Sequence, residues 1–242
     1  MEFNSASFLF AFLPLLLIVY RLVPGTRGKN ACIISASLLF YAFGDLRHVP
    51  LLLGSVALHY LVGLLLLRLT RGKRAVLAAC VTLDVAALLG FKLAGHLPLG
   101  VSFFTFQAIS YVVDAYRDKD NGSRNFFAVL QYITFFPQIV SGPLMKFSEI
   151  RPYFTRRTVN AAQTASGLRR FTVGLAKKLL LSSAAASLAD AVFALAPGAV
   201  DIRAAWLGAI CYSLQLYFDF SGRTREISAR CSTRRATRPS RG

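Results

Sequence analysis

The sequence has few of the side chains from which active sites are usually built. Its 242 residues include three histidines and four cysteines. The cysteines form no C-x-x-C pair and have no histidine at metal-ligand spacing, so buried structural thiols are favoured over a metal or redox site. The sequence also has no credible Ser-His-Asp order and no glycine-rich phosphate loop. These patterns predict no metal and no bound cofactor, and they assign no catalytic residue.

Acidic residues are scarce too, because 11 Asp and Glu stand against 28 Lys and Arg, for a formal net charge of +17. The excess is unevenly distributed. Residues 223–242 contain seven arginines and one glutamate, which leaves +11 for residues 1–222. Much of that remainder lies in connections between apolar blocks, where basic residues report orientation and attraction to anionic lipid. We therefore expect contact with membrane lipid and no nucleic-acid partner.

Apolar residues, in contrast, make up 55% of the chain, and the mean hydropathy is +0.52. Several apolar blocks approach or exceed the roughly 20 residues that cross a bilayer core. The longest are Phe8–Val23, Leu51–Leu67, Ala75–Leu93 and Ala204–Phe220. The first block has no basic residue before it and no cleavage site after it, so it is predicted to stay in place as a spanning helix. The fold class expected is all-α, a polytopic transmembrane helical protein.

The distribution of charge predicts how these helices cross the membrane. The connection after the first block carries Arg21, Arg27 and Lys29, which places it in the cytoplasm and the N-terminus outside. The same rule places the basic zone Lys146–Lys178 and the C-terminal tail inside. Clean alternation then fails at Phe126–Val140.

We therefore predict that Phe126–Val140 is re-entrant, entering the membrane and returning to the same side. A break at Pro137, Gly142 and Pro143 supports this, because proline removes a helical donor and glycine permits a turn. Irregular backbone at membrane depth survives only where protein or water shields it, so a re-entrant segment implies an internal cavity. Lys146–Asn160 is predicted to follow as an amphipathic surface helix.

Polar side chains within the apolar segments are the candidate functional residues, because such groups usually face a bundle interior or a wet cavity. They lie on three segments and comprise Gln107, Tyr111, Asp114, Gln131, Gln138, Gln215, Asp219 and Ser221. Spacings of three and four residues place Gln107, Tyr111 and Asp114 on one helix face. The three faces are predicted either to line one tunnel or to join helices by hydrogen bonds, and the sequence favours neither. For His59, a hydrogen-bonded structural role is favoured over proton transfer, and Asp84 is expected to find a partner on another helix.

Three segments resemble signatures of the bacterial membrane-bound O-acyltransferases. They are PLGVSFFTFQAISYVVDAYR (98–117), FFPQIVSGP (135–143) and LQLYFDFSG (214–222), in the order and approximate spacing of that family. The N-terminal half, including SLLFYAFG (37–44), is similar to the alginate O-acetyltransferase branch. Residues 1–222 are accordingly identified as the N-terminal part of such a domain.

The resemblance implies transfer of an acetyl group from a cytoplasmic donor or carrier, through the bacterial inner membrane, to an exported polysaccharide such as alginate. It also implies periplasmic acetylation or export proteins as partners, and a ring of helices around a thin centre pierced by a tunnel. In such proteins the histidines of acyl transfer lie in segments beyond the LQLYFDFSG motif. None of His48, His59 and His96 matches them, so no catalytic residue is carried over, and we expect this chain to be inactive alone.

Two alternatives stay open. Residues 223–242 are either an out-of-frame or truncated ending, which is favoured because the change falls inside a family motif, or a polybasic lipid anchor. The protein itself is either an O-acyltransferase or, less in keeping with the motifs, a non-enzymatic transporter or export scaffold. Paired broken helices with internal symmetry would indicate transport, but the sequence predicts one broken element and no repeat.

Overall fold

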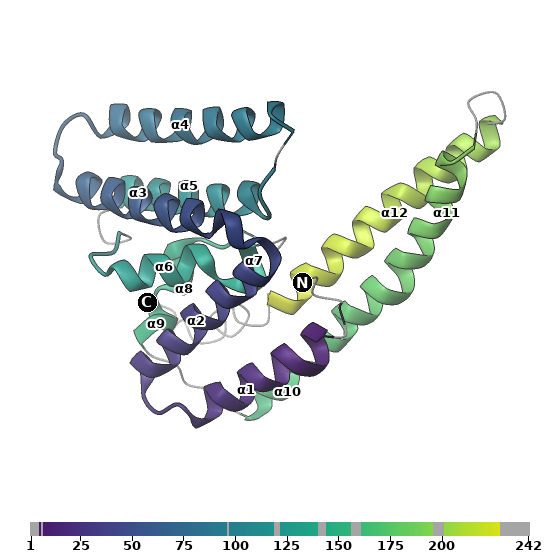
Figure 1. Ribbon diagram of the computed structural model, residues 1–242, viewed down its shortest axis with the longest axis horizontal. Coiled ribbons are helices and arrows are strands. Elements are labelled where there is room, and N and C mark those ends of the chain that lie inside the picture. The colour runs from purple at the N-terminus through teal and green to yellow at the C-terminus, as the bar shows by residue number, and fades with distance from the viewer. Residues whose placement is uncertain are drawn as a thin grey trace, which may run out of the picture. The chain divides into compact units, whose positions relative to one another are not determined.

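Helices account for all of the regular secondary structure in the described part of the chain, which confirms the all-α prediction. The computed structural model describes residues 5, 7–95, 97–118, 122–139, 144–155, 161–195 and 201–227 (Figure 1). The chain divides into two compact units, Met1–Thr158 and Val159–Gly242. The second therefore begins well before the predicted tail, and each unit is considered by itself below.

The first unit starts with a run of long helices joined by short turns. A π-helical segment, η1 (Phe8–Phe12), continues into α1 (Leu13–Leu22), and α2 (Thr26–Asp45) leads through the short 3₁₀ helix η2 (Leu46–His48) into α3 (Val49–Arg68). The next two helices are α4 (Lys73–Leu93) and α5 (Val101–Arg117). Figure 1 shows α3, α4 and α5 running alongside one another.

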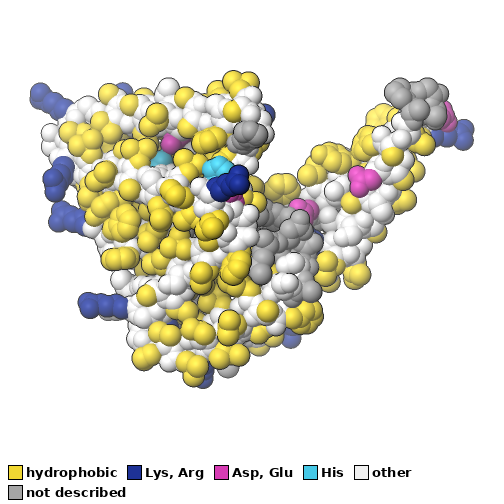
Figure 2. Space-filling view, in the orientation of Figure 1, with side chains coloured by type: hydrophobic (Ala, Val, Ile, Leu, Met, Phe, Trp, Pro, Cys, Tyr) yellow, Lys and Arg dark blue, Asp and Glu magenta, His cyan; other side chains and the backbone are white. Residues whose placement is uncertain are grey.

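Within the described residues, three helical stretches are long and apolar enough to cross a membrane: Thr26–Arg68, which joins α2 and α3, Lys73–Leu93, and Ala162–Phe193. They include two of the four longest predicted blocks, while Phe8–Leu22 forms a shorter apolar helix. Large apolar side chains such as Leu83 and Leu89 on α4, each 54% exposed, face outward, and hydrophobic side chains cover much of the visible surface of this unit (Figure 2). Such a surface suits lipid and not water. The chain is a multi-pass membrane protein.

The core of the first unit lies where α3 and α5 pack against α6 (Phe126–Thr134). Leu52, Val56 and Leu66 on α3 are fully buried there, as are Ala108 and Val112 on α5. Gly63 permits this close packing, because a Cβ atom there would lie 2.6 Å from the hydroxyl oxygen of Tyr111.

The predicted re-entrant segment is a broken helix. Phe135, with ψ of 110°, interrupts the chain between α6 and the short helix α7 (Phe136–Ile139). The break therefore falls at Phe135, ahead of Pro137, which lies inside α7 where the first helical turn tolerates proline. Gly142 and Pro143 lie outside the described residues. At about 1.5 Å per residue, the nine residues of α6 are too short to cross a bilayer. Return to the same membrane side stays a prediction.

The expectation of one amphipathic helix over Lys146–Asn160 was wrong for the residues that the structure describes. Two short helices, α8 (Phe147–Ile150) and α9 (Pro152–Thr155), take its place. Arg151 ends the first, and Pro152, which lacks an amide hydrogen, begins the second. Residues 156–160 lie outside the described part.

The second unit is a helical hairpin with one irregular turn. Its first arm comprises α10 (Ala161–Ala176), the π-helical segment η4 (Lys177–Ser182) and α11 (Ser183–Phe193). The second arm, α12 (Ile202–Ile227), packs along all three (Figure 1). The helix therefore continues for five residues past Gly222. It contains the predicted span Ala204–Phe220, whose mean hydropathy is lowered by Gln215 and Asp219.

Candidate functional site

Two of the predicted polar segments meet in the interior of the first unit. Gln107 on α5 donates from Nε2 to Oε1 of Gln138 on α7 at 3.0 Å. Gln107 and Gln138 are both buried, with 3% and 4% of their surface exposed. The pair is incompletely satisfied, because Oε1 of Gln107 and Nε2 of Gln138 have no hydrogen-bonding partner among the described residues. One buried acceptor and one buried donor are thus left on adjoining side chains.

A contact with α2 holds α7 in place beside α5. The amide of Phe136, the first residue of α7, donates to Oγ of Ser37 at 3.2 Å. The Phe136 ring also belongs to an aromatic cluster with Phe8, Phe12 and Phe40, in which ring centroids lie 5.6 to 6.2 Å apart. Because both contacts precede Gln138 by only two residues, they fix where its amide lies.

The other two residues on the α5 face are also buried, but their polar atoms have partners. The Tyr111 hydroxyl donates to the carbonyl oxygen of Ser123 at 3.3 Å. Oδ2 of Asp114 accepts from the backbone N–H of Ser148 at 3.4 Å and from its hydroxyl at 3.5 Å. The Phe147 ring lies edge-on to Tyr111 at 5.0 Å. These contacts join α5 to the segments that follow it.

Gln131 on α6 is buried as well, with 3% of its surface exposed. A shared helical face for Gln131 and Gln138 would require one continuous helix, and the break at Phe135 removes that helix. Their seven-residue spacing predicts a shared face on a continuous helix, and this prediction was wrong, although both side chains lie inside the unit.

The third predicted segment lies in the second unit, where lysines on η4 meet the polar end of α12. Nζ of Lys178 lies 3.5 Å from Oδ1 of Asp219, and Lys177 donates to Oγ of Ser221 at 3.1 Å. Ser182 donates to the backbone oxygen of Gln215 at 3.1 Å. Asp219 and Ser221 thus bind groups of their own unit, and convergence of all three faces on one tunnel stays a prediction.

Sequence spacing missed one cluster, formed by His59 on α3 with Cys80 and Asp84 on α4. Nε2 of His59 lies 3.0 Å from Oδ2 of Asp84, and its Nδ1 lies 2.7 Å from the carbonyl oxygen of Ser55. Cys80 donates to the same Oδ2 at 3.8 Å. The three ligand-type atoms lie within 4.8 Å of one another, a distance that a metal ion could bridge. Each group has a hydrogen-bonding contact, however, so we assign the cluster a structural role.

Long apolar helices around buried polar side chains define an integral membrane protein with a polar interior. Comparison with known families identifies which one. The model of the membrane-bound O-acyltransferase family matches residues 101–229, which contain α5, the broken helix and most of the second unit. The chain belongs to this family.

Curated relatives agree with this assignment. The chain is 35% identical over 250 residues to the probable alginate O-acetylase AlgI of Pseudomonas aeruginosa, covering 92% of this chain and 47% of the relative. It is 34% identical to the protein of that name in Azotobacter vinelandii, covering 92% and 49%. It is also 31% identical to a peptidoglycan O-acetyltransferase of Helicobacter pylori, covering 91% and 51%. The chain spans about half the length of these relatives.

Proposed function

We propose that the protein is a membrane-bound O-acetyltransferase that modifies hydroxyl groups of an exported polysaccharide. The family assignment and the curated relatives, two of them alginate O-acetylases by name, support this activity over transport or scaffolding. The acceptor proposed is alginate or a chemically similar polysaccharide. The proposed location is the bacterial inner membrane, with the N-terminus outside and the end of α12 in the cytoplasm. Periplasmic acetylation or export proteins are proposed as partners.

The Gln107–Gln138 pair carries the proposal for where the path runs. Nε2 of Gln138 and Oε1 of Gln107 have no partner among the described residues, and a hydroxyl group that accepts from the first and donates to the second would satisfy both. A carbonyl oxygen of an acyl group can accept from Nε2 alone. Buried polar atoms without partners are costly unless water or ligand meets them. This pair is therefore proposed to line the path along which acyl donor and acceptor approach each other.

The donor side of the path is proposed to face the cytoplasm. An acetyl carrier, bound from that side, would deliver its acyl group toward α7 across the thin centre that the broken helix leaves. Since α6 is only nine residues long, the polar interior is reached without a full bilayer crossing. Acetyl transfer itself would require a general base near the acceptor hydroxyl, and no residue of this chain is assigned that role.

A chimera tests the proposal. Residues 1–220 replace the matched part of the Pseudomonas aeruginosa relative, in a strain lacking that relative, and acetate released from the exopolysaccharide is measured. Membranes with the 242-residue chain alone give the baseline. We expect the chimera to restore acetylation, and Gln138→Leu to lower it roughly tenfold through loss of a polar contact in the path.

Phe106→Leu is the matched control, because Phe106 lies beside Gln107 but is 48% exposed on the outer face of α5. It should leave acetylation unchanged. A chimera that reaches the membrane in normal amount and transfers no acetyl group would refute the proposed activity. Full activity in Gln138→Leu would refute only the position of the path.

A further inference from the structure

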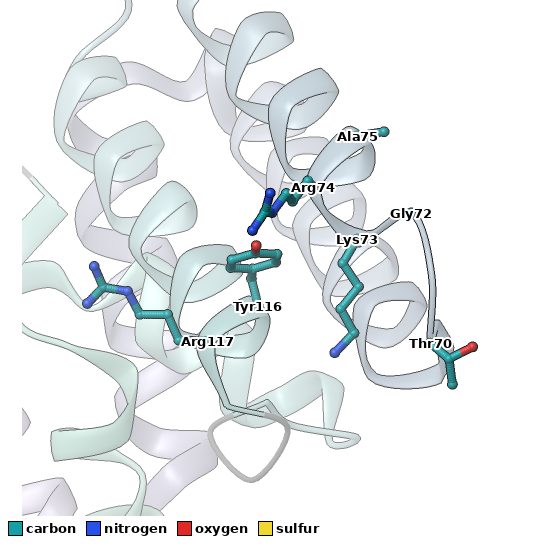
Figure 3. A pocket seen from close by; sticks show the side chains of 7 residues that line it. All are labelled: Thr70, Gly72, Lys73, Arg74, Ala75, Tyr116 and Arg117. Carbon is teal, nitrogen blue, oxygen red and sulfur yellow. The ribbon is translucent and has the colours of Figure 1, made fainter.

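A basic cavity lies where the α3–α4 connection meets the end of α5 (Figure 3). It is open to the surface and has a volume of about 840 Å³. The lining residues are Thr70, Gly72, Lys73, Arg74, Ala75, Tyr116 and Arg117. In Figure 3, Tyr116 lies between Arg117 on one side and Lys73 and Arg74 on the other. Three cations and two hydroxyl groups therefore border one cavity.

The described part of the chain provides no counter-charge for these three cations. Among the described residues, Lys73, Arg74 and Arg117 form no ion pair or side-chain hydrogen bond. None of the lining residues is acidic, and the nearest acidic residue along the chain is Asp118, directly after Arg117. Three like charges around one cavity repel each other, and a bound anion would relieve that repulsion.

A second basic cavity also lies at this end of α3. It measures about 370 Å³ and is lined by Tyr60, Leu64, Leu67, Arg68 and Arg124. The Tyr60 hydroxyl donates to the backbone oxygen of Arg124 at 2.9 Å, which holds the Arg124 backbone against α3. Figure 2 shows the Lys and Arg side chains of the first unit projecting mainly from one edge. The positive charge is thus concentrated at one end of the helices.

We propose that the larger cavity binds the phosphate of an anionic lipid headgroup. Lys73 and Arg74 would neutralise the phosphate, and the Tyr116 hydroxyl would donate to one of its oxygens. Arg117 and Thr70, whose polar ends point away from Tyr116 in Figure 3, would contribute from the rim, Arg117 through its charge. Basic pockets between spanning helices on the cytoplasmic side bind such headgroups. The inference rests on the membrane orientation proposed above and not on acetyl transfer, so the two proposals can fail separately.

The exposed apolar side chains of α3 and α4, the two helices that the cavity-lining connection joins, favour a lipid over a soluble phosphate ester. Leu61 and Leu65 on α3 are 60% and 45% exposed, and Leu83 and Leu89 on α4 are each 54% exposed. Leu65 lies within one turn of the end of α3 that carries the cavity, and Leu83 and Leu89 lie farther along α4, the helix that begins at Lys73. Acyl chains of a lipid whose phosphate occupied the cavity would lie along them, whereas a soluble ester would gain nothing from this surface.

Native mass spectrometry of the purified 242-residue protein, in nonionic detergent, tests the proposal with phosphatidylglycerol and phosphatidylcholine as probes. The wild type should bind phosphatidylglycerol more tightly. Each basic residue near an anionic headgroup is worth roughly fivefold in affinity, so Lys73→Gln/Arg117→Gln should lose ~30-fold for phosphatidylglycerol. Lys73→Arg/Arg117→Lys, which keeps both charges, should lose far less.

The control is Arg47→Gln/Lys92→Gln, which removes two charges from exposed residues at the opposite ends of α3 and α4. It should change the affinity by less than roughly twofold. Equal losses in the two double variants, or no loss in the cavity variant, would overturn the proposal. Displacement of the lipid by an equal concentration of glycerol 3-phosphate would assign the cavity to a soluble phosphate and would also overturn it. If the cavity variant loses its helical circular dichroism, a salt series on the wild type replaces that variant. Raising NaCl from 0.05 to 0.5 M shortens the screening length roughly threefold, so unchanged binding over this range would count against the proposal.

Discussion

Removing either half of the His59–Asp84 pair should destabilise the first unit. The side chains are 1% and 9% exposed and join α3 to α4 at 3.0 Å. Asp84→Ala leaves Nε2 of His59 inside the protein without its acceptor, while Nδ1 stays against the carbonyl oxygen of Ser55. His59→Ala leaves the Asp84 carboxyl with the weaker contact from Cys80 at 3.8 Å.

The expected magnitude follows from which partner is left behind. A buried donor without its acceptor costs about 1–3 kcal/mol, whereas interhelical hydrogen bonds in a membrane protein average about 0.6 kcal/mol and reach about 1.7. Because this pair lies inside the unit and not against lipid, we expect each single variant to lose about 2 kcal/mol of unfolding free energy. His59→Ala/Asp84→Ala removes both groups together, so it should also lose about 2 kcal/mol, well short of an additive loss of about 4.

The assay is SDS-induced unfolding of the purified protein, followed by far-ultraviolet circular dichroism, for the wild type, both single variants and the double variant. Leu83→Ala is the control, since Leu83 precedes Asp84 and is 54% exposed; it should change the unfolding free energy by less than about 0.5 kcal/mol. Additivity of the two single variants to within about 0.5 kcal/mol would refute the pairing.

Three further predictions concern contacts within each unit. Gly63→Ala should lower the unfolding free energy by about 1–3 kcal/mol in a thermal melt, because its Cβ would lie 2.6 Å from the Tyr111 hydroxyl. Gly54→Ala on the same helix is the control and should be neutral or stabilising, because nothing lies within 4 Å of its Cβ. Ser37→Ala should speed hydrogen exchange at the Phe136 amide, which loses its acceptor, whereas Ser35→Ala on the exposed side of α2 should not. Lys178→Gln should lower the unfolding free energy by less than about 1 kcal/mol, because its ion pair with Asp219 is only partly buried, at 21% and 28% exposure. A larger loss in thermal unfolding would show that this pair is coupled to other contacts.

The sequence predicted those features that depend on local pattern. Helical periodicity placed Gln107, Tyr111 and Asp114 on one face, and all three are buried in α5. Long apolar blocks predicted α4 almost residue for residue, because a lipid-facing helix must be apolar along its whole length. The expectation that Asp84 pairs with another helix is also confirmed, although the identity of the partner was open.

Features that depend on contacts between distant segments were missed. His59 and Cys80 lie 21 positions apart, so no motif spacing could reveal that both approach Asp84. The helix break falls at Phe135 and not at Pro137. The amide of Phe136, the first residue after the break, donates to Oγ of Ser37, which lies 99 residues earlier in the chain. Proline marks where a helix tolerates a start, but the tertiary contact decides where the preceding helix ends.

The sequence left two roles open for the buried polar residues, which were to line a path or to join helices. The number of hydrogen-bonding partners of each residue distinguishes these two roles. Asp114 receives two hydrogen bonds from Ser148, Tyr111 binds Ser123, and His59 contacts both Ser55 and Asp84. A side chain whose polar atoms are satisfied within the protein has little left for a ligand, so we infer that these residues connect segments of the first unit. Gln107 and Gln138 instead keep a buried acceptor and a buried donor that no described residue satisfies. Burying such atoms without partners is unfavourable, so a polar group of a substrate or a water molecule would be favoured at this point. We infer that the acyl path passes there.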